Sequence, residues 1–187
     1  MRLLLLDNYD SFTWNLHHLL CAHVPVDVVR NDAITVDEAA AYDRIVLSPG
    51  PGLPAEAGIT MELLHKLMPS HHILGVCLGM QAIVEACGGA LFNQERVRHG
   101  VATTLTPDPP VDPLFAGLPA RFEVGLYHSW AADPQRMPAE LRITARSAEG
   151  VVMAVRHTNG RVCGVQFHPE SVLTPLGGAM VRNWVWG

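Results

Sequence analysis

Cys77 is the residue best placed for nucleophilic chemistry, because of the residues on either side of it. It lies in the run Gly75-Val76-Cys77-Leu78-Gly79, between an apolar run and a segment with helical periodicity. This is the pattern of a nucleophile elbow, a sharp strand-to-helix turn that requires flanking glycines. The helix N-terminus favours a thiolate there, and the Leu78 N–H would face a developing oxyanion. A small buried core cysteine is the alternative that these residues leave open.

A cysteine nucleophile needs a general base, and His168 with Glu170 is the candidate pair. The strand predicted over 161–167 places alternate apolar side chains on one face and leaves His168, at its end, on the other. Glu170 follows by two residues, so in an extended chain both side chains point the same way. A carboxylate there can fix the imidazole tautomer and stabilise its charged form. The alternative is a solvated His–Glu pair at a strand terminus.

The segment 48–54, Ser-Pro-Gly-Pro-Gly-Leu-Pro, is a third candidate for contact with a ligand. Its glycines let the backbone approach a ligand closely, and its prolines make the loop stiff. Gly50 can therefore supply a second N–H for an oxyanion. No Gly-Lys-Ser/Thr follows, which excludes a P-loop, and the glycine spacing excludes a dinucleotide-binding fingerprint. A rigid connection between a strand and a helix is the alternative.

The first half of the chain alternates short apolar runs with helical patterns, which predicts a parallel sheet. The predicted strands cover 3–6, 26–29, 44–47 and 73–76. The helices between them are marked by Phe12, Leu16, Leu19 and Leu20, by Leu63, Leu64, Leu67 and Met68, and by Met80, Ile83, Val84 and Cys87. Asp10 or Ser11 is predicted to cap the first helix. Because Cys77 and the 48–54 loop both follow strands, we expect them at the carboxyl edge of the sheet, where ligands usually bind.

The second half is predicted to be loop-rich around the prolines of 107–119, with strands over 151–157 and 161–168. Asn159-Gly160 predicts a two-residue hairpin with positive φ at both positions, and a short helix closes the chain over 176–186. The fold class is therefore α/β, a mostly parallel doubly wound sheet flanked by helices, with a small antiparallel hairpin region. We expect one domain over 1–187.

Composition excludes several classes of protein. The chain has 187 residues, of which 49% are hydrophobic and 17% charged, and this excludes a disordered chain. The formal net charge of −5 argues against nucleic acid as a partner. No apolar stretch approaches the ~20 residues that span a bilayer, and the N-terminal leucines end too early for a signal peptide. We expect a cytoplasmic protein that does not bind membranes.

The other cysteines and the paired histidines do not suggest a site. No two cysteines have C-x-x-C spacing, so a disulfide framework is not expected, and Cys21, Cys87 and Cys163 are predicted to be core residues. The His pairs at 17–18 and 71–72 lack further ligands at zinc spacing. No metal site is expected.

Several motifs together resemble those of the class I glutamine amidotransferases. They are Gly-Val-Cys-Leu-Gly-Met-Gln at 75–81, Ser-Pro-Gly-Pro-Gly at 48–52 and Gly-Val-Gln-Phe-His-Pro-Glu-Ser at 164–171. Asp-Asn-Tyr-Asp-Ser-Phe-Thr at 7–13, Arg-His-Gly at 98–100 and Tyr-His-Ser-Trp at 127–130 are similar to the glutaminase subunits of anthranilate synthase (component II) and aminodeoxychorismate synthase. The resemblance covers nearly the whole chain. Met80 and Trp130 depart from it, standing where histidine and leucine are frequent.

The resemblance implies a flavodoxin-like fold and a Cys-His-Glu triad. Cys77 would attack the side-chain amide of L-glutamine, His168 would act as base and then acid, and Glu170 would orient His168. A glutamyl thioester would form and be hydrolysed to glutamate, with release of ammonia. Gly50 and Leu78 would form the oxyanion hole from their backbone N–H groups.

The resemblance also implies the substrate contacts and a partner. The glutamine contacts would be Gly50, Pro51, Gly52, Gln81, Ser129 and Trp130, and the partner interface would include Ser11, His99 and Gly100. The partner would be a chorismate-binding synthase subunit that uses the ammonia. No cofactor is implied for this chain, and Mg is expected only in that partner.

The resemblance leaves two products of the partner reaction open, anthranilate and aminodeoxychorismate. The runs 152–157 and 161–164 look nearer to the anthranilate subunits, which serve tryptophan biosynthesis, and this is the assignment we favour. The runs 10–15 and 30–33 look nearer to the aminodeoxychorismate subunits, which serve folate biosynthesis. A stand-alone cysteine hydrolase and a non-catalytic binding subunit are the alternatives from other classes.

Overall fold

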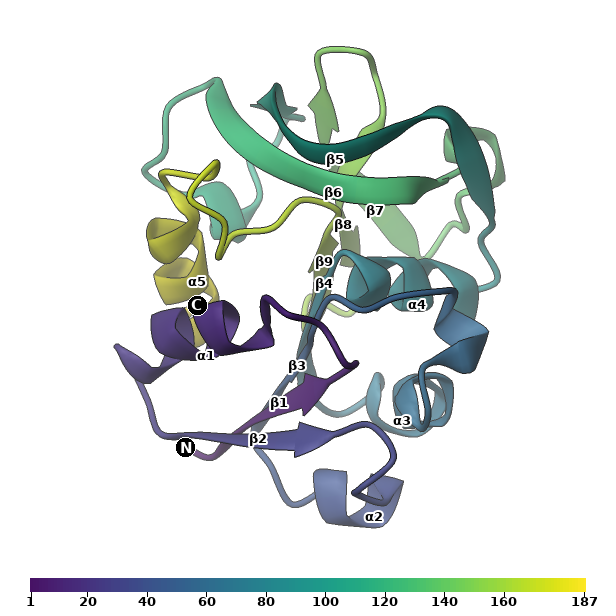
Figure 1. Cartoon of the computed structure of the whole chain (residues 1–187), viewed down its shortest axis with the longest axis vertical. Coiled ribbons are helices and arrows are strands. Elements are labelled where there is room, and N and C mark those ends of the chain that lie inside the picture. The colour runs from purple at the N-terminus through teal and green to yellow at the C-terminus, as the bar shows by residue number, and fades with distance from the viewer.

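A computed structural model of the chain describes residues 1–94 and 98–187 and shows one mixed sheet between two layers of helices (Figure 1). The strands are β1 (Leu3–Asp7), β2 (Val26–Arg30), β3 (Arg44–Leu47), β4 (His72–Val76), β5 (Leu91–Pro107), β6 (Phe122–Ala132), β7 (Leu141–Ser147), β8 (Val152–His157) and β9 (Val162–Val165). The helices are α1 (Thr13–Cys21), α2 (Val36–Ala39), α3 (Thr60–Leu67), α4 (Leu78–Ala86) and α5 (Gly177–Trp186), with 3-10 turns at Pro54–Glu56, Pro113–Phe115 and Pro134–Arg136.

Both faces of β1, β3, β4 and β9 are buried, which explains their apolar runs, whereas the edge strand β2 is partly exposed. In β1, Leu3 and Leu5 pack with α1 and α5, whereas Leu4 and Leu6 pack with α3 and α4. Figure 1 shows these two helix pairs on opposite sides of the sheet. Alternating side chains of one strand therefore serve two separate cores.

The sheet has the strand order β2-β1-β3-β4-β9-β8-β7-β5-β6. The first five strands pair in parallel, and we call them the parallel half. From β9 onward every pairing is antiparallel, and β8, β7, β5 and β6 form the antiparallel half. The α/β class and the four N-terminal strands are confirmed. The antiparallel part is larger than the predicted hairpin region, because β5, β6 and β7 lie where no strand was predicted.

The predicted cap of the first helix is wrong. Helix α1 is preceded by Phe12, which has helical backbone angles and no side-chain cap. The Asp10 carboxylate instead accepts the Phe12 N–H at 2.7 Å, so its bond goes to the N-cap residue and not to an N–H of the helix. The Asp7 carboxylate accepts the Tyr9 N–H and the Thr13 hydroxyl, at 2.9 and 2.8 Å, so side-chain bonds hold this loop closed.

The predicted hairpin exists between β8 and β9, but its turn differs. Only Gly160 has a positive φ, of 78°, whereas Asn159 does not. The Asn159 side chain accepts the Arg161 N–H at 2.9 Å, which closes the turn without a left-handed asparagine. Strand β9 also ends at Val165, earlier than predicted, so His168 lies beyond the strand and not at its last position.

All four cysteines are free thiols, but one predicted core position is wrong. Cys163 is buried and Cys87 is partly buried, whereas Cys21 is exposed with its Sγ 3.1 Å from Nε2 of His17. Cys21 is the last residue of α1 and lies off the helix face that buries Thr13, Leu16 and Leu20.

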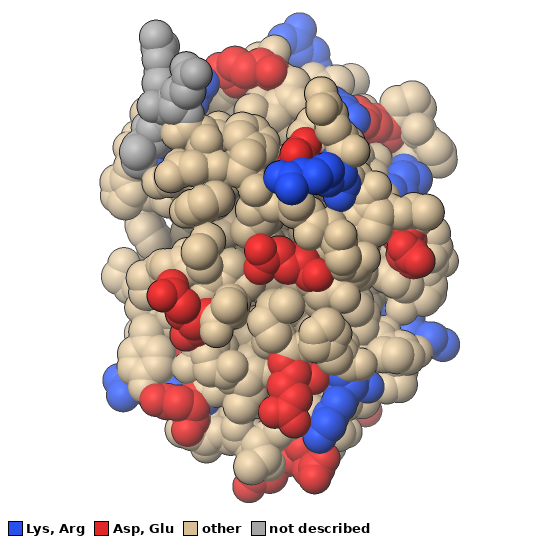
Figure 2. Space-filling model, turned by 90° about the vertical axis from the view of Figure 1, so that its right-hand side faces the viewer, with Lys and Arg blue, Asp and Glu red and all other residues tan. Residues whose placement is uncertain are grey.

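The surface is mixed in charge on the face shown in Figure 2, where acidic and basic side chains are interspersed. No extended basic patch lies among the described residues on that face. None of the helices in the described part of the chain has the length and apolar character needed to cross a membrane.

Candidate active site

Cys77 occupies a strained turn between β4 and α4. Its φ of 53° and ψ of −102° are uncommon for a residue with a side chain. A Cβ atom on Gly79 would lie 2.6 Å from the Leu47 carbonyl oxygen, and one on Gly75 would overlap the backbone of Gly79. The Cys77 N–H donates to the Val165 carbonyl at 2.8 Å, which fixes the turn against β9. The sequence prediction of a nucleophile elbow matches this geometry.

The 48–54 loop reaches the elbow and is held there by Asn8, at the end of β1. Asn8 is buried and bonds twice to Ser48. Its backbone N–H donates to the Ser48 hydroxyl at 2.8 Å, and its side-chain amide donates to the Ser48 carbonyl at 2.9 Å. A Cβ on Gly50 would lie 2.7 Å from both Asn8 and Leu78, so only glycine fits. Within residues 1–94 and 98–187, the N–H groups of Gly50 and Leu78 have no acceptor.

His168 and Glu170 form a buried hydrogen-bonded pair. Nδ1 of His168 lies 2.6 Å from Oε1 of Glu170, and the two residues are only 2% and 9% exposed. The backbone of His168 is held on both sides, since its N–H donates to Gly125 of β6 and its carbonyl accepts the Thr174 hydroxyl. Nε2 of His168 and Oε2 of Glu170 have no hydrogen-bond partner among the described residues.

The charge state of His168 depends on its two neighbours. Burial alone would lower the pKa of the imidazole, but the Cys77 thiol, the Glu170 hydrogen bond and the negative charges of both groups raise that pKa to about 10. The contact between Cys77 and His168 raises the pKa without meeting the geometry of a hydrogen bond, since Nε2 has no partner. The site therefore favours a proton on His168.

Two buried glutamines connect Cys77 to the antiparallel half. The Gln81 side chain donates to the Trp130 carbonyl at 3.0 Å and to Oε1 of Gln166 at 3.2 Å. The Gln166 side chain lies 3.6 Å from Sγ of Cys77. The sequence interpretation missed Gln166. Its signal was a polar residue two positions before His168 in an otherwise apolar strand pattern.

A cavity of about 260 Å³ opens beside Cys77. All six residues that the resemblance implied as glutamine contacts line it, with Tyr127 and His128 in addition: Gly50, Pro51, Gly52, Gln81, Tyr127, His128, Ser129 and Trp130. We call residues 127–130 of β6 the pocket wall. The structure thus brings the predicted contacts from three separate segments to one place, and Trp130 lines the pocket instead of the core.

His128 is a buried residue of the pocket wall that the sequence interpretation did not select. Its Nδ1 lies 2.8 Å from the Trp130 carbonyl and 2.9 Å from the Gln94 side-chain nitrogen. Burial, followed by the positive charges of His168 and Arg98, lowers the pKa of His128 to about 4 despite the bond to Trp130. His128 is therefore neutral at physiological pH.

The residues implied for a partner interface lie around this site. Ser11, His99 and Gly100 are all exposed. The His99 ring packs against Tyr127 with ring centroids 5.3 Å apart, and Ser11 precedes Phe12, whose ring lies 5.4 Å from His168. A protein that covers these residues would also cover the approach to the triad.

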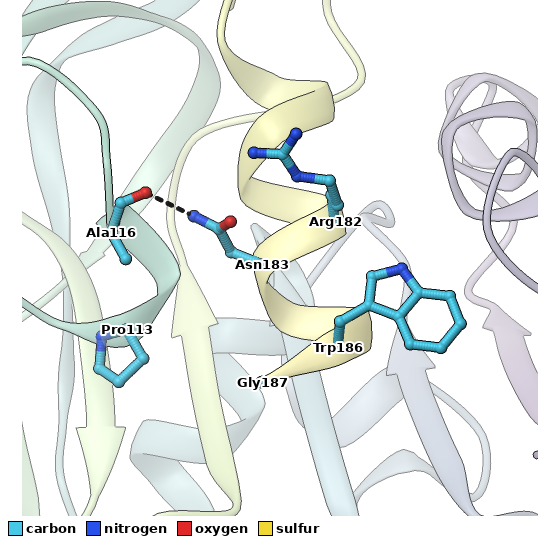
Figure 3. Close-up of a pocket in the computed structure, with 6 residues that line it drawn as sticks. All are labelled: Pro113, Ala116, Arg182, Asn183, Trp186 and Gly187. Carbon is cyan, nitrogen blue, oxygen red and sulfur yellow. Dashed lines mark hydrogen bonds between the residues drawn. The ribbon is translucent and has the colours of Figure 1, made fainter.

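A second depression lies between the end of α5 and the 3-10 turn Pro113–Phe115 (Figure 3). Its volume is about 370 Å³, and Pro113, Ala116, Arg182, Asn183, Trp186 and Gly187 line it. These lining residues include no nucleophile and no general base, so the depression is not a catalytic candidate. Among residues 1–94 and 98–187, no three His, Cys, Asp or Glu side chains gather as metal ligands.

Comparisons with known proteins all identify the same family. The model of the family described as glutamine amidotransferase class-I matches residues 4–187. An anthranilate synthase component 2 from Mycobacterium tuberculosis is 41% identical over 191 residues, which cover 99% of this chain and 82% of that protein. An aminodeoxychorismate synthase component 2 from Escherichia coli is 40% identical over 186 residues, 98% of each. A solved glutamine amidotransferase from Thermotoga maritima, at 14% identity, shares the fold with a TM-score of 0.79 over 99% of this chain and 96% of its own.

Proposed function

The chain belongs to the class I glutamine amidotransferases, and from that premise we propose that it releases ammonia from L-glutamine at Cys77 and delivers it to a chorismate-using synthase subunit. The observation that carries the proposal is the arrangement around the 260 Å³ cavity. Cys77, on its strained elbow, and Gly50 line this cavity, and the buried His168–Glu170 pair lies beside the Cys77 thiol. The N–H groups of Gly50 and Leu78 have no acceptor among the described residues.

The reaction starts with attack on the side-chain amide carbon of glutamine. His168 holds the proton of the Cys77 thiol, and the sulfur forms a bond to this carbon. The carbonyl oxygen becomes an oxyanion, which the N–H groups of Gly50 and Leu78 stabilise. His168 then gives its proton to the amide nitrogen, the carbon–nitrogen bond breaks, and ammonia leaves the glutamyl thioester.

Hydrolysis of the thioester restores the enzyme. His168 takes a proton from water as the water oxygen attacks the thioester carbon. The carbon–sulfur bond breaks, glutamate leaves, and the proton on His168 returns to Cys77. Glu170 holds Nδ1 of His168 through both steps, so that Nε2 remains the atom that accepts and donates the proton.

Recognition of glutamine falls to the far end of the cavity. Gln81 orients the Trp130 carbonyl, and Ser129 and Trp130 present backbone groups to the amino-acid end of the substrate. Since this contact uses backbone atoms, tryptophan at position 130 is compatible with the same substrate. The stiff Pro51-Gly52 segment also lines the cavity.

The test separates ammonia release from ammonia use. In a complex with the synthase partner, Cys77→Ser should abolish product formation from glutamine by more than about 1,000-fold, while synthesis from added ammonium continues. The matched control is Cys21→Ser, because Cys21 is exposed and remote from the cavity. Loss of both activities would remove the ammonia-donor role, and glutamine hydrolysis at full rate without any partner would favour a stand-alone hydrolase.

We favour anthranilate as the product, with aminodeoxychorismate as the second candidate, because the relatives divide between these two names. Copurification identifies the large subunit that binds this chain. Each purified synthase subunit, mixed with the chain, glutamine and chorismate, then reports its product. Stimulated formation of aminodeoxychorismate without anthranilate would exclude the favoured assignment.

A further inference from the structure

The imidazole of His168 is enclosed by two aromatic rings. Its ring centroid lies 4.9 Å from that of Tyr127 and 5.4 Å from that of Phe12, at interplanar angles of 63° and 67°. The Phe12 and Tyr127 rings also contact one another, with centroids 4.9 Å apart. The three rings therefore form one packed unit that limits the tilt of the imidazole.

Each of the two rings is anchored by further hydrogen bonds. The Tyr127 hydroxyl lies 3.0 Å from the Ser171 hydroxyl, and the Ser171 N–H donates to the His168 carbonyl. The Phe12 backbone is held by Asp10, and its carbonyl accepts the Leu16 N–H as α1 begins. One ring thus comes from the antiparallel half and the other from the loop after β1.

The thiol does not hold the imidazole in place. Nε2 of His168 has no hydrogen-bond partner among the described residues, so the Cys77 side of the ring is not tied to an acceptor or donor. Glu170 fixes only Nδ1, at 2.6 Å. Packing from the sides must therefore supply the remaining restraint on the plane of the ring.

We propose that Phe12 and Tyr127 are positioning residues for His168, and that they keep Nε2 directed at the Cys77 thiol. This inference rests on the proposed role of His168 as the general base. A misplacement of about 1 Å between reacting groups can cost about 100-fold in rate. Loss of either ring should therefore lower kcat more than it changes KM. His99 packs on the outer edge of Tyr127, so contact of a partner with His99 reaches the same unit.

The experiment uses Tyr127→Leu and Phe12→Leu, which remove one ring each, and Tyr127→Phe, which keeps the ring. The first readout is the rate at which iodoacetamide alkylates Cys77 at pH 6.5 and at pH 9, measured by mass analysis of the Cys77 peptide. Without a positioned imidazole the thiolate is less stable at low pH, so the ratio of the two rates should fall about tenfold in both leucine variants. Tyr127→Phe should keep the ratio within about threefold of the parent chain.

The second readout is glutaminase activity in the synthase complex. Both leucine variants should lose about 30-fold to 100-fold in kcat, with KM within about twofold. Trp14→Leu is the matched control, because Trp14 is 63% exposed and its ring packs only on His17 among the described aromatic residues. A cooperative thermal unfolding transition in each variant is the check that it is folded.

Three outcomes would overturn the proposal. The first is an alkylation ratio and a kcat within twofold of the parent in folded Phe12→Leu or Tyr127→Leu. The second is a raised KM with full kcat, which would make Tyr127 a contact for glutamine only. The third is a Tyr127→Phe defect equal to that of Tyr127→Leu. If the chain has no glutaminase activity, the alkylation ratio still tests the positioning of His168.

Discussion

The parallel half of the sheet holds the reacting groups, and the antiparallel half holds the wall against which the substrate lies. Cys77 and Gly50 follow β4 and β3, in a turn and a loop where a single added Cβ would meet backbone or packed side chains. The pocket wall, residues 127–130, belongs to β6, whose pairing with β5 is irregular on both sides of Arg98. Strand β9 pairs with both halves, and His168 follows it.

This difference indicates that the two halves have separate roles, one in the reaction and one in substrate binding. Close steric contacts fix the elbow, so the position of Cys77 does not depend on the substrate. The pocket wall pairs with β5 in a shifted register, and its Trp130 carbonyl accepts hydrogen bonds from Gln81 and His128. Changes at His168, or at the Phe12 and Tyr127 rings packed against it, should therefore act on kcat. Changes at the Trp130 end of the pocket wall should act on KM and on local stability.

The largest effect is expected from His168→Ala, at the border between the halves. Without the general base, kcat for glutamine hydrolysis should fall by about 100-fold to 10,000-fold, while KM stays within about twofold. Steady-state kinetics of the synthase complex measure both values. His71→Ala is the control, since His71 lies at the opposite end of β4 from Cys77. A rise in KM with kcat preserved would remove His168 from the reaction.

A smaller effect is expected from His128 on stability at acid pH. The pKa of His128 is lowered to about 4, mainly by burial, so the folded chain binds this proton less readily than the unfolded chain does. The contribution of neutral His128 is present above pH ~6.5 and is lost as pH falls towards 4, at a cost of up to about 3 kcal/mol. Urea unfolding at pH 7.5, 6 and 5 measures this loss, and His128→Gln should make it shallower. Equal pH dependence in both proteins would contradict the neutral buried state.

The smallest effect is expected from Gln81→Ala, which removes the bond between α4 and the pocket wall. Loss of one buried hydrogen bond corresponds to about 1 kcal/mol, and an unpaired Trp130 carbonyl adds to this. KM for glutamine should rise about tenfold, with kcat within about threefold. Glu85→Gln, one turn further along α4, is the control because Glu85 does not line the cavity. A large fall in kcat at unchanged KM would contradict the assignment of the reaction to the parallel half and of substrate binding to the pocket wall.

The sequence predicts the parallel half well because β1, β3, β4 and β9 are largely buried on both faces. Leu3–Leu6 and 73–76 are apolar without interruption and end in polar or glycine-rich turns, a pattern that few other structures produce. Strand β5 was missed because its stretch 93–100 is polar and includes Gly100 with a φ of 69°, and its register with β6 shifts twice. Such irregularity removes the two-residue period by which strands are recognised.

The triad could be predicted, whereas its surroundings could not. Cys77 is marked by its flanking glycines, and His168 with Glu170 by a spacing of two residues. Ser129 and Trp130 were selected through the family resemblance alone, since their distance from Cys77 in the sequence carries no pattern. In the sequence, Phe12 fits the apolar face of a helix and Tyr127 is part of a family motif. Neither pattern indicates contact with His168, because only tertiary packing brings the two rings to it.

The most direct measurement is the covalent trapping of the nucleophile with a chloroketone analogue of glutamine. Mass analysis after digestion should find one analogue per chain, attached to the peptide that carries Cys77, and excess glutamine should slow the reaction. The Cys77→Ala variant should remain unlabelled. Labelling of Cys21, Cys87 or Cys163 in place of Cys77, or no protection by glutamine, would contradict glutamine binding and attack at this site.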